Sequence, residues 1–309
     1  MISYYEFKKH YRILDEDLKA VNVSWEELCS IYNDYEEKKS SFEGVLDSFL
    51  EEYFSPAIIR KHNLKIHSIG SRVKDSEHLI EKLIRRKKEN AKKYSGCDLT
   101  NYLKFITDIA GIRILLVYKA DWENIHDYII NSFENDEKNY IKKSIEDFDE
   151  DTNHTYIAEP PKVHIRTGDC KDIYTKVLPP DRVIEDRTYR SAHYIIKYQG
   201  IYIEIQVRTL FEEGWGEVDH SILYPTNKDN YIYKEYTELL NRLSGLADEM
   251  SSFFVTLKDV KAGVDIVKEE KDDQSSIIDA GEKCKDDKIG DSKDELTFID
   301  EISRVVRKR

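Results

Sequence analysis

Polar side chains of several kinds alternate along a β-prone run at residues 201–209. Tyr202, Glu204, Gln206 and Arg208 share one parity, and isoleucines and a valine occupy the other. Because successive side chains of a strand point to opposite faces, this spacing gathers an acid, an amide and a guanidinium on one face. A solvated sheet face is the common alternative for polar strand residues. The variety of these groups favours a binding or catalytic face.

The dipeptide Gln199-Gly200 predicts a tight turn between this strand and a preceding strand at 189–198. A two-residue turn fixes the register and adds an imidazole and a hydroxyl to the polar face. The expected register sets these residues opposite one another: Tyr198 and Ile201, Ile195 and Glu204, His193 and Gln206, Ser191 and Arg208.

Basic residues form a second group near position 75. Arg72 and Lys74 alternate along an extended segment, and the next helix adds Lys82 and Arg85. A triphosphate needs several cations that converge from different elements, so we predict that Arg72, Lys74 and Lys82 bind phosphate. For three cations farther along the helix we adopt the alternative, a solvated helix face: Arg86, Lys87 and Lys88.

Asp108 lies at the entrance to a short apolar strand at 112–118. A carboxylate in this place commonly caps a turn. Together with Glu204 it would instead suit Mg²⁺, which takes one or two carboxylates besides substrate phosphates and water. The sequence does not bring the two acids together by itself.

The elements that must position these residues alternate between helix and strand. Helices are expected over 1–60, 76–94, 99–105 and 122–133, and an extended segment over 64–74; a connection spans 134–151 and a loop 179–188. Strands mixed with helices, including one tight hairpin, indicate an α+β fold with a mixed sheet.

After Pro225 the chain is predicted to be helical again. Its apolar residues follow a coiled-coil-like spacing of 4, 3, 4, 3 and 4, in the order Leu239, Leu243, Leu246, Met250, Phe253 and Leu257. We interpret this helix as packing on its own domain, with self-association as the alternative. Residues 261–309 alternate in charge and predict a flexible tail or a short helical appendage.

Composition limits the class of protein. The 309 residues carry a net charge of −13, which does not suit a general nucleic-acid binder. No apolar run approaches the roughly 18 to 20 residues that span a membrane, and no secretory signal is visible. The four cysteines, Cys29, Cys97, Cys170 and Cys284, match no metal or redox spacing. We expect a cytoplasmic protein with reduced thiols.

Five motifs occur in order at credible spacing: HSIGSRVKDSEHLIEKLIRR, DIAGIRILLVY, YRSAHYIIKY, EIQVRTLFEEGWGEVDH and LLNRLSGLADEM. Together they resemble the synthetase domain of the RelA/SpoT alarmone synthetases. The resemblance implies a nucleotidyltransferase-like core over 61–230, an N-terminal helical segment over 1–60, the amphipathic helix over 231–260 and the tail over 261–309.

The resemblance also implies roles for single residues. Asp108 and Glu204 would be the catalytic and Mg²⁺-binding carboxylates. The implied ATP-binding residues are Arg72, Lys74, Ser76, Lys82, Arg85 and Arg113. The implied acceptor-binding residues are Tyr189, which would stack on the acceptor base, and His193, Gln206, Arg208 and His220.

One segment departs from the family pattern. Many members carry Lys-x-Asn-Gly directly before Tyr-Arg-Ser, where this chain has Glu185-Asp186-Arg187-Thr188. The missing asparagine removes a contact to guanine, for which Arg187 is a candidate replacement. The departure leaves the transfer chemistry intact and puts the identity of the acceptor in question.

The implied activity is transfer of pyrophosphate from ATP to the 3′-hydroxyl of GDP or GTP. Two alternatives are a toxin-type relative that modifies the 3′ end of tRNA, and a silent nucleotide-binding module, which the intact Asp108 and Glu204 disfavour. The hydrolase half of bifunctional relatives is expected to be absent. We interpret the isolated pair His126-Asp127 as a surface feature.

Overall fold

The computed structural model describes residues 3–21, 23–94, 96–140, 154–223 and 230–277. The chain divides into two units, Met1–Thr256 and Leu257–Arg309. All of the features below lie in the first unit, except the end of the last helix. No helix in the described ranges is both long enough and apolar enough to cross a membrane.

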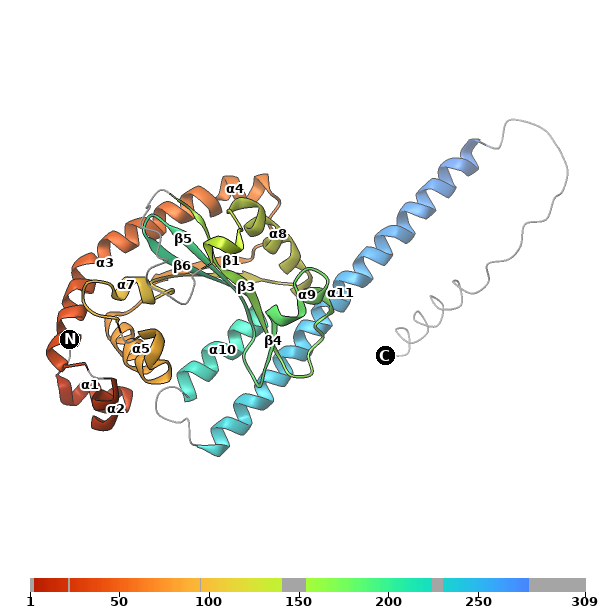
Figure 1. The fold of residues 1–309 in the computed structure, drawn as a ribbon. Helices are drawn as coiled ribbons and strands as arrows, with labels where there is room; N and C mark the ends of the chain where they lie inside the picture. The colour runs from red at the N-terminus through yellow and green to blue at the C-terminus, as the bar shows by residue number, and fades with distance from the viewer. Residues whose placement is uncertain (1–2, 22, 95, 141–153, 224–229, 278–309) are drawn as a thin grey trace. The chain divides into compact units, whose positions relative to one another are not determined.

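A mixed sheet of six strands lies at the centre of the first unit (Figure 1). Its order is β1-β2-β6-β5-β3-β4. The strands span Ser68–Val73 (β1), Ala110–Leu116 (β2), Tyr156–Arg166 (β3), Val183–Asp186 (β4), Ser191–Tyr198 (β5) and Ile201–Thr209 (β6). Two neighbouring pairs are parallel, β2 with β6 and β3 with β4, and the other three are antiparallel. The predicted α+β fold with a mixed sheet is confirmed.

The predicted hairpin forms with the predicted register. Tyr198 pairs with Ile201, and Glu204 lies opposite Ile195. Gln199 and Gly200 have φ angles of 42° and 84°, as a two-residue turn between twisted strands requires. The register therefore delivers the polar residues of both strands to one face.

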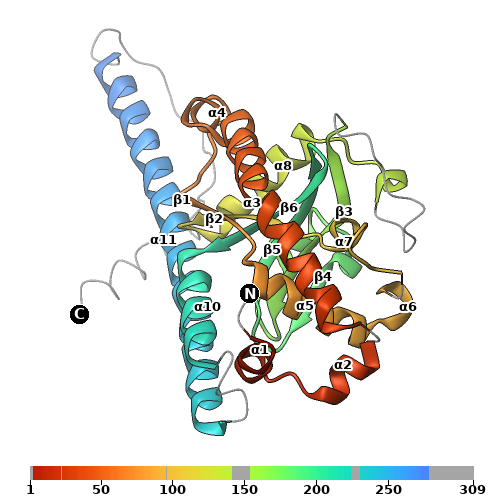
Figure 2. The same ribbon diagram turned by 90° about the vertical axis from the view of Figure 1, so that its left-hand side faces the viewer.

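Helices cover the other face of the sheet. The helices span Tyr4–Tyr11 (α1), Asp15–Val21 (α2), Trp25–Phe54 (α3), Pro56–Lys61 (α4), Ser76–Glu89 (α5), Ala91–Tyr94 (α6), Tyr102–Phe105 (α7), Trp122–Ser132 (α8), Asp172–Thr175 (α9), Leu210–Leu223 (α10) and Tyr231–Ile277 (α11). Helix α3 crosses this face (Figure 2). It buries residues at helical spacing, among them Leu28, Ile31 and Tyr35, in one core with the isoleucines of β6. The apolar half of β6 thus anchors the strand and leaves its polar half to the opposite face.

Several predicted boundaries differ from the structure. The helix predicted over 76–94 is interrupted at Asn90, which has non-helical φ and ψ of −141° and 67°. The one predicted over 99–105 begins only at Tyr102. The loop predicted over 179–188 contains β4, and β5 begins at Ser191 rather than at residue 189. Of the connection over 134–151, residues 141–153 lie outside the described part of the chain.

Two predictions of surface exposure were wrong. Lys87 is buried, with 7% of its surface exposed, and its Nζ donates to the carbonyl of Cys97 at 2.6 Å. His126 is also buried, and its Nδ1 lies 3.0 Å from the hydroxyl of Tyr194. Burial lowers the pKa of His126, so a neutral ring fills this position. Both polar groups are tolerated inside because each has a hydrogen-bond partner.

Helix α11 turns the opposite face inward from the one we predicted. The leucines at 239, 243 and 246 are 43%, 53% and 57% exposed, as are Met250 and Phe253 at 56% and 55%. The buried side instead consists of Gly245 and four polar residues, Thr237, Asn241, Ser244 and Asp248. The prediction that the apolar seam of this helix packs on its own domain was therefore wrong. The helix also continues past the predicted end at 260, to Ile277, and residues 278–309 of the predicted tail lie outside the described ranges.

Candidate active site

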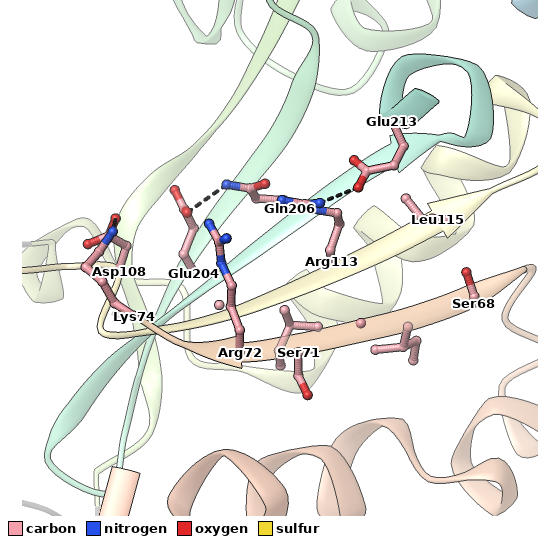
Figure 3. Close-up of a pocket in the computed structure, with 14 residues that line it drawn as sticks. Ser68, Ser71, Arg72, Lys74, Asp108, Arg113, Leu115, Glu204, Gln206 and Glu213 are labelled. Atoms are coloured by element: carbon pink, nitrogen blue, oxygen red, sulfur yellow. Dashed lines mark hydrogen bonds and ion pairs between the residues drawn. The ribbon is translucent and has the colours of Figure 1, made fainter. Parts of the chain in front are cut away.

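Three cavities adjoin one another on the polar face of the sheet. The β1 cavity, of about 340 Å³, lies between β1, β2 and β6 and is drawn in Figure 3. The α5 cavity, of about 440 Å³, follows the start of α5, and the β3 cavity, of about 380 Å³, lies toward β3 and β5. Asp108 lines the first two, Glu204 the first and third, and Lys82 the second and third. These three side chains thus mark the place where the cavities meet.

Asp108 and two lysines form the first half of the centre. Antiparallel pairing of β1 with β2 sets Val73 opposite Ala110, which brings Lys74, directly after β1, close to the two residues before β2. Lys74 Nζ consequently lies 2.9 Å from Asp108 Oδ2, and Lys82 Nζ, from the second turn of α5, lies 2.7 Å from the same oxygen. All three side chains are more than four-fifths buried.

Asp108 and the two lysines stabilise one another in their charged forms. Burial by itself would raise the pKa of Asp108, but Lys82 and Lys74 hold it below its ordinary value. Burial lowers the pKa of Lys82, against the attraction of Asp108. The other oxygen of Asp108, Oδ1, is buried without a hydrogen-bond partner in the described residues. An unpaired buried carboxylate oxygen is costly and is suited to receive a cation.

Glu204 forms the second half of the centre. Its Oε1 lies 3.0 Å from His193 Nδ1, and its Oε2 accepts a hydrogen bond of 2.8 Å from Gln206. Burial would raise the pKa of Glu204, but the hydrogen bonds from His193 and Gln206 keep it below the ordinary value, against the charge of Asp108. Glu204 is therefore ionised at neutral pH. In Figure 3 its carboxylate and the side chain of Arg72 point into the same space.

Tyr189 connects Glu204 to the start of α10. Its hydroxyl lies 3.0 Å from His193 Nε2 and accepts a hydrogen bond of 2.8 Å from Arg208. Arg208 also covers the ring, with its guanidinium carbon 5.2 Å from the ring centre. The second nitrogen of Arg208 donates to Glu213 at 3.1 Å. A continuous hydrogen-bonded chain thus runs along the polar face.

Glu213 ends this series of hydrogen bonds and connects it to Arg113. The guanidinium of Arg113 is paired with Glu213, and it donates to Glu217 at 2.8 Å. Arg113 and Glu213 both line the β1 cavity. The side chain of Arg113 is held at the edge of this cavity by two acids of α10.

The remaining predicted residues divide into two groups. Arg72 lines the β1 and α5 cavities, Arg85 lines the α5 cavity, and His220 of α10 lies beside them there. His220 was predicted on the acceptor side with His193, and the structure places it among the cations of α5 instead. Ser76 lines none of the three cavities, because its buried hydroxyl donates to Glu36 of α3.

The β3 cavity contains residues that the sequence did not single out. Lys162 and His164 of β3 and Lys93 of α6 line it, together with Arg86 and His193. Arg86 was assigned to a solvated face; it is exposed, but it borders this cavity and the α5 cavity. A signal was present in β3, where Lys162 and His164 alternate with the buried Val163 and Ile165. Pro160 and Pro161 precede these residues and made a strand hard to recognise.

The donor set is small for a metal centre made of protein alone. No cluster of three or more His, Cys, Asp or Glu suited to a metal ion occurs in the described ranges. Mg²⁺ does not need such a cluster when it also binds substrate phosphates. The unpartnered Asp108 Oδ1 fits one ligand position of this kind, while both oxygens of Glu204 already accept hydrogen bonds.

The chain is similar in sequence to known proteins. Residues 71–229 match the model of a region found in RelA/SpoT proteins. The chain is 25% identical over 256 residues to GTP pyrophosphokinase YwaC of Bacillus subtilis (strain 168), an alignment that covers 79% of this chain and 94% of that protein. Two solved structures are similar at 22% identity. The first is small alarmone synthetase 2 from Bacillus subtilis, with a TM-score of 0.46; the match covers 73% of this chain and 98% of that chain. The second is a GTP pyrophosphokinase family protein from Streptococcus pneumoniae, with a TM-score of 0.42; the match covers 85% of this chain and 98% of that chain. Because the matched region spans more than half of the 309 residues, the chain belongs to the RelA/SpoT family.

Proposed function

We propose that this chain transfers the pyrophosphoryl group of ATP to the 3′-hydroxyl of GDP or GTP. The observation that carries the proposal is the position of Asp108 and Glu204, which lie where cation-lined cavities meet. Similarity to a GTP pyrophosphokinase over most of both chains supports the choice of reaction and acceptor.

ATP binds on the side of β1 and α5. Arg72, Lys74 and Lys82 reach this side from a strand, a loop and a helix, which is the convergence that a triphosphate requires. Arg85 and Arg113 stand at its two edges, and His220 adds an imidazole. Ser76 contributes indirectly, since it fixes the start of α5 against α3.

The acceptor nucleotide binds on the side of Tyr189 and His193. Tyr189 offers an aromatic face, and His193, Gln206 and Arg208 surround it with hydrogen-bonding groups. The β3 cavity supplies Lys162, Arg86 and Lys93 for the 5′-phosphates. Arg187, which stands in the place of the family's missing asparagine, is paired with Glu238 of α11 at 2.6 Å.

The reaction is an in-line displacement at the β-phosphorus of ATP. The acceptor oxygen O3′ forms a bond to this phosphorus while the bond to the oxygen shared with the α-phosphorus breaks, and AMP leaves with that oxygen. Glu204, ionised and held by His193 and Gln206, accepts the proton of the hydroxyl. Lys74, Lys82 and Arg72 stabilise the charge on the phosphates.

Mg²⁺ is the cofactor that this chemistry calls for. Asp108 would hold it through the unpartnered Oδ1, with Glu204 close by. When bound, it would neutralise phosphate charge and align the triphosphate. The lysines on Oδ2 keep Asp108 ionised and ready to bind a cation.

Self-association through α11 belongs to the same proposal. An outer stripe, formed by Ile232, Tyr236, Leu239, Leu243, Leu246, Met250, Phe253 and Phe254, is 43% to 67% exposed. Its spacing is that of a coiled-coil seam, whose natural partner is a helix with the same spacing. These side chains expose on the order of 900 Å², about what one partner buries in a standard interface. A second copy of this chain meets both requirements.

We also place the reaction in the cytoplasm. ATP and guanine nucleotides are available there, and Cys97 and Cys170 are free thiols, as a reducing compartment favours.

One labelling experiment tests the proposed reaction. Purified protein is incubated with Mg²⁺, ATP labelled at the γ-phosphate, and either GDP, GTP or bulk tRNA. The label is expected in a product derived from GDP or GTP, with one AMP released for each transfer. Label that appears only in tRNA, or only as free phosphate, would overturn the proposal. Omission of Mg²⁺ should abolish transfer.

A further inference from the structure

The inner side of α11 contacts the segment that carries Tyr189. Glu238, Asn241 and Gly245 lie at spacings of three and four residues, and therefore on one face of the helix. They contact Arg187, Thr188 and Arg190 respectively, the residues on either side of Tyr189. We call Glu238, Asn241 and Gly245 the α11 clamp.

Asn241 makes the central contacts of the clamp. It is 1% exposed, and its Nδ2 donates to the carbonyl of Thr188 at 2.6 Å. The backbone carbonyl of Asn241 accepts a hydrogen bond of 3.1 Å from Arg190. A single residue of the helix thus fixes the backbone before Tyr189 and the side chain after it.

Gly245 allows the helix to approach Arg190 closely. A Cβ at this position would lie 2.7 Å from Arg190 Nη2, a distance that carbon atoms do not reach. Arg190 cannot easily move aside, because its side chain is 1% exposed and its Nε is 2.5 Å from Asp169 Oδ2. The glycine is therefore needed where it is.

The polarity of this helix face also requires an explanation. A helix that only filled space would bury its leucines, and α11 exposes Leu239, Leu243 and Leu246 and buries Thr237, Asn241 and Asp248. Burying polar groups costs free energy unless they are hydrogen-bonded. For Asn241 this compensation comes from the side-chain hydrogen bond to Thr188, at the predicted acceptor site, while Arg190 bonds the backbone carbonyl of the same residue.

We propose that the α11 clamp is a positioning device for the acceptor, through which Asn241 and Gly245 hold Tyr189 in its stacking position. Tyr189 is tied at its hydroxyl by His193 and Arg208, and the clamp fixes its backbone from the other side. This inference rests on the proposed function, because it assumes that the acceptor stacks on Tyr189.

Two variants of the full-length protein remove the clamp in different ways. Asn241→Leu keeps the number and branching of the heavy side-chain atoms and deletes the hydrogen bond to Thr188, and Gly245→Ala pushes against Arg190. Misplacement of a substrate-binding group by about 1 Å costs up to roughly a hundredfold in rate. We expect kcat/KM for GDP or GTP to fall by at least about tenfold in both variants, mainly through KM, while KM for ATP stays within about twofold.

A matched control is available on the same buried face. Thr237→Val removes a hydroxyl that is bonded to the carbonyl of Lys234 in its own helix, and it should leave acceptor kinetics unchanged. Glu238→Gln alters a partly exposed member of the clamp and carries little risk of misfolding. It should raise the acceptor KM by a few-fold.

Hydrogen exchange separates the clamp from the reaction. Amide exchange at Thr188 to Arg190 should accelerate in Asn241→Leu and not in Thr237→Val. If exchange and acceptor KM change equally in both variants, the clamp is only structural and the inference fails. The inference also fails if neither quantity changes in Asn241→Leu. Faster exchange with an unchanged acceptor KM also refutes it. Lack of transfer to GDP and GTP by the unmodified protein would instead refute the proposed function, while the exchange result still tests the clamp.

Discussion

Each oxygen of Glu204 is held by a different partner, which makes this residue sensitive to the loss of its charge. In Glu204→Gln the side-chain volume is kept, but an amide neither accepts the proton of the acceptor nor attracts His193 in the same way. We expect the transfer rate to fall by at least about a hundredfold. ATP binding, measured by titration calorimetry, should change little. Near-normal turnover in this variant would refute the assigned role.

Asp108 combines a binding role with an electrostatic one, and the two can be separated. Asp108→Asn should abolish both activity and its dependence on Mg²⁺, because an amide is a poor Mg²⁺ ligand. It also leaves Lys74 and Lys82 buried without their counter-charge, so the melting temperature should fall as well. Lys82→Met is the control for the loss of ion pairing. It removes one of the two lysines on Asp108, which relieves their mutual repulsion, and it keeps the carboxylate. Retained Mg²⁺-dependent activity in Asp108→Asn would restrict the residue to a structural role.

The pKa shifts of the same two acids fix the sign of the response to acid. The pKa values of Asp108 and Glu204 are both lowered in the folded protein. A group of this kind contributes stability above its unfolded pKa and loses it as the pH falls through the folded pKa. Activity and this part of the stability should therefore persist at neutral pH and decline only in acid, below about pH 4.

At the scale of elements, the hairpin could be predicted and the strand before it could not. Gln199-Gly200 specifies a turn by backbone conformation alone, so it fixed the register and the polar face. Strand β3 contains Pro160 and Pro161, which argue against a central strand because proline lacks an amide donor. The structure accommodates them where the pairing of β3 with β5 shifts register, between Glu159 and Lys162.

The face of α11 was mispredicted for a similar reason. Apolar spacing shows which side of a helix avoids water, but it does not show which molecule covers that side. Here tertiary hydrogen bonds of Asn241 and Asp248 decide which side faces the domain. Likewise Lys87 could not be recognised as buried, since its partner is a backbone carbonyl ten residues away.

Asp248 gives a test of how α11 is attached. It accepts a hydrogen bond of 3.0 Å from Thr209, the last residue of β6. Burial, and then the charge of Glu212, raise the pKa of Asp248 to about 7. A raised folded pKa contributes stability below the unfolded value near 4, which is lost as the pH rises through about 7.

Asp248→Asn should remove this loss. The variant cannot ionise, so its stability should vary less between pH 5 and pH 8 than that of the unmodified protein. At pH 8 it should be more stable, by on the order of 1 kcal/mol. Melting temperatures at several pH values measure the difference, with Ser244→Ala as a control on the same buried face. A parallel pH dependence in both proteins would show that Asp248 is already ionised without cost.

At the scale of the whole molecule, the proposal is that the outer stripe of α11 holds two copies of the chain together. The stripe lies on the side of the helix opposite the α11 clamp, so a second copy could bind there without displacing the acceptor site. Leu243→Glu together with Leu246→Glu places two charges in the seam, which are costly to bury in a coiled-coil interface. The mass measured by light scattering should fall to that of a single chain, 36.5 kDa. Lys234→Glu changes the charge of an exposed residue of the same helix away from the seam and should leave the mass of the assembly unchanged. If the unmodified protein is already monomeric at micromolar concentration, the stripe serves another purpose than self-association.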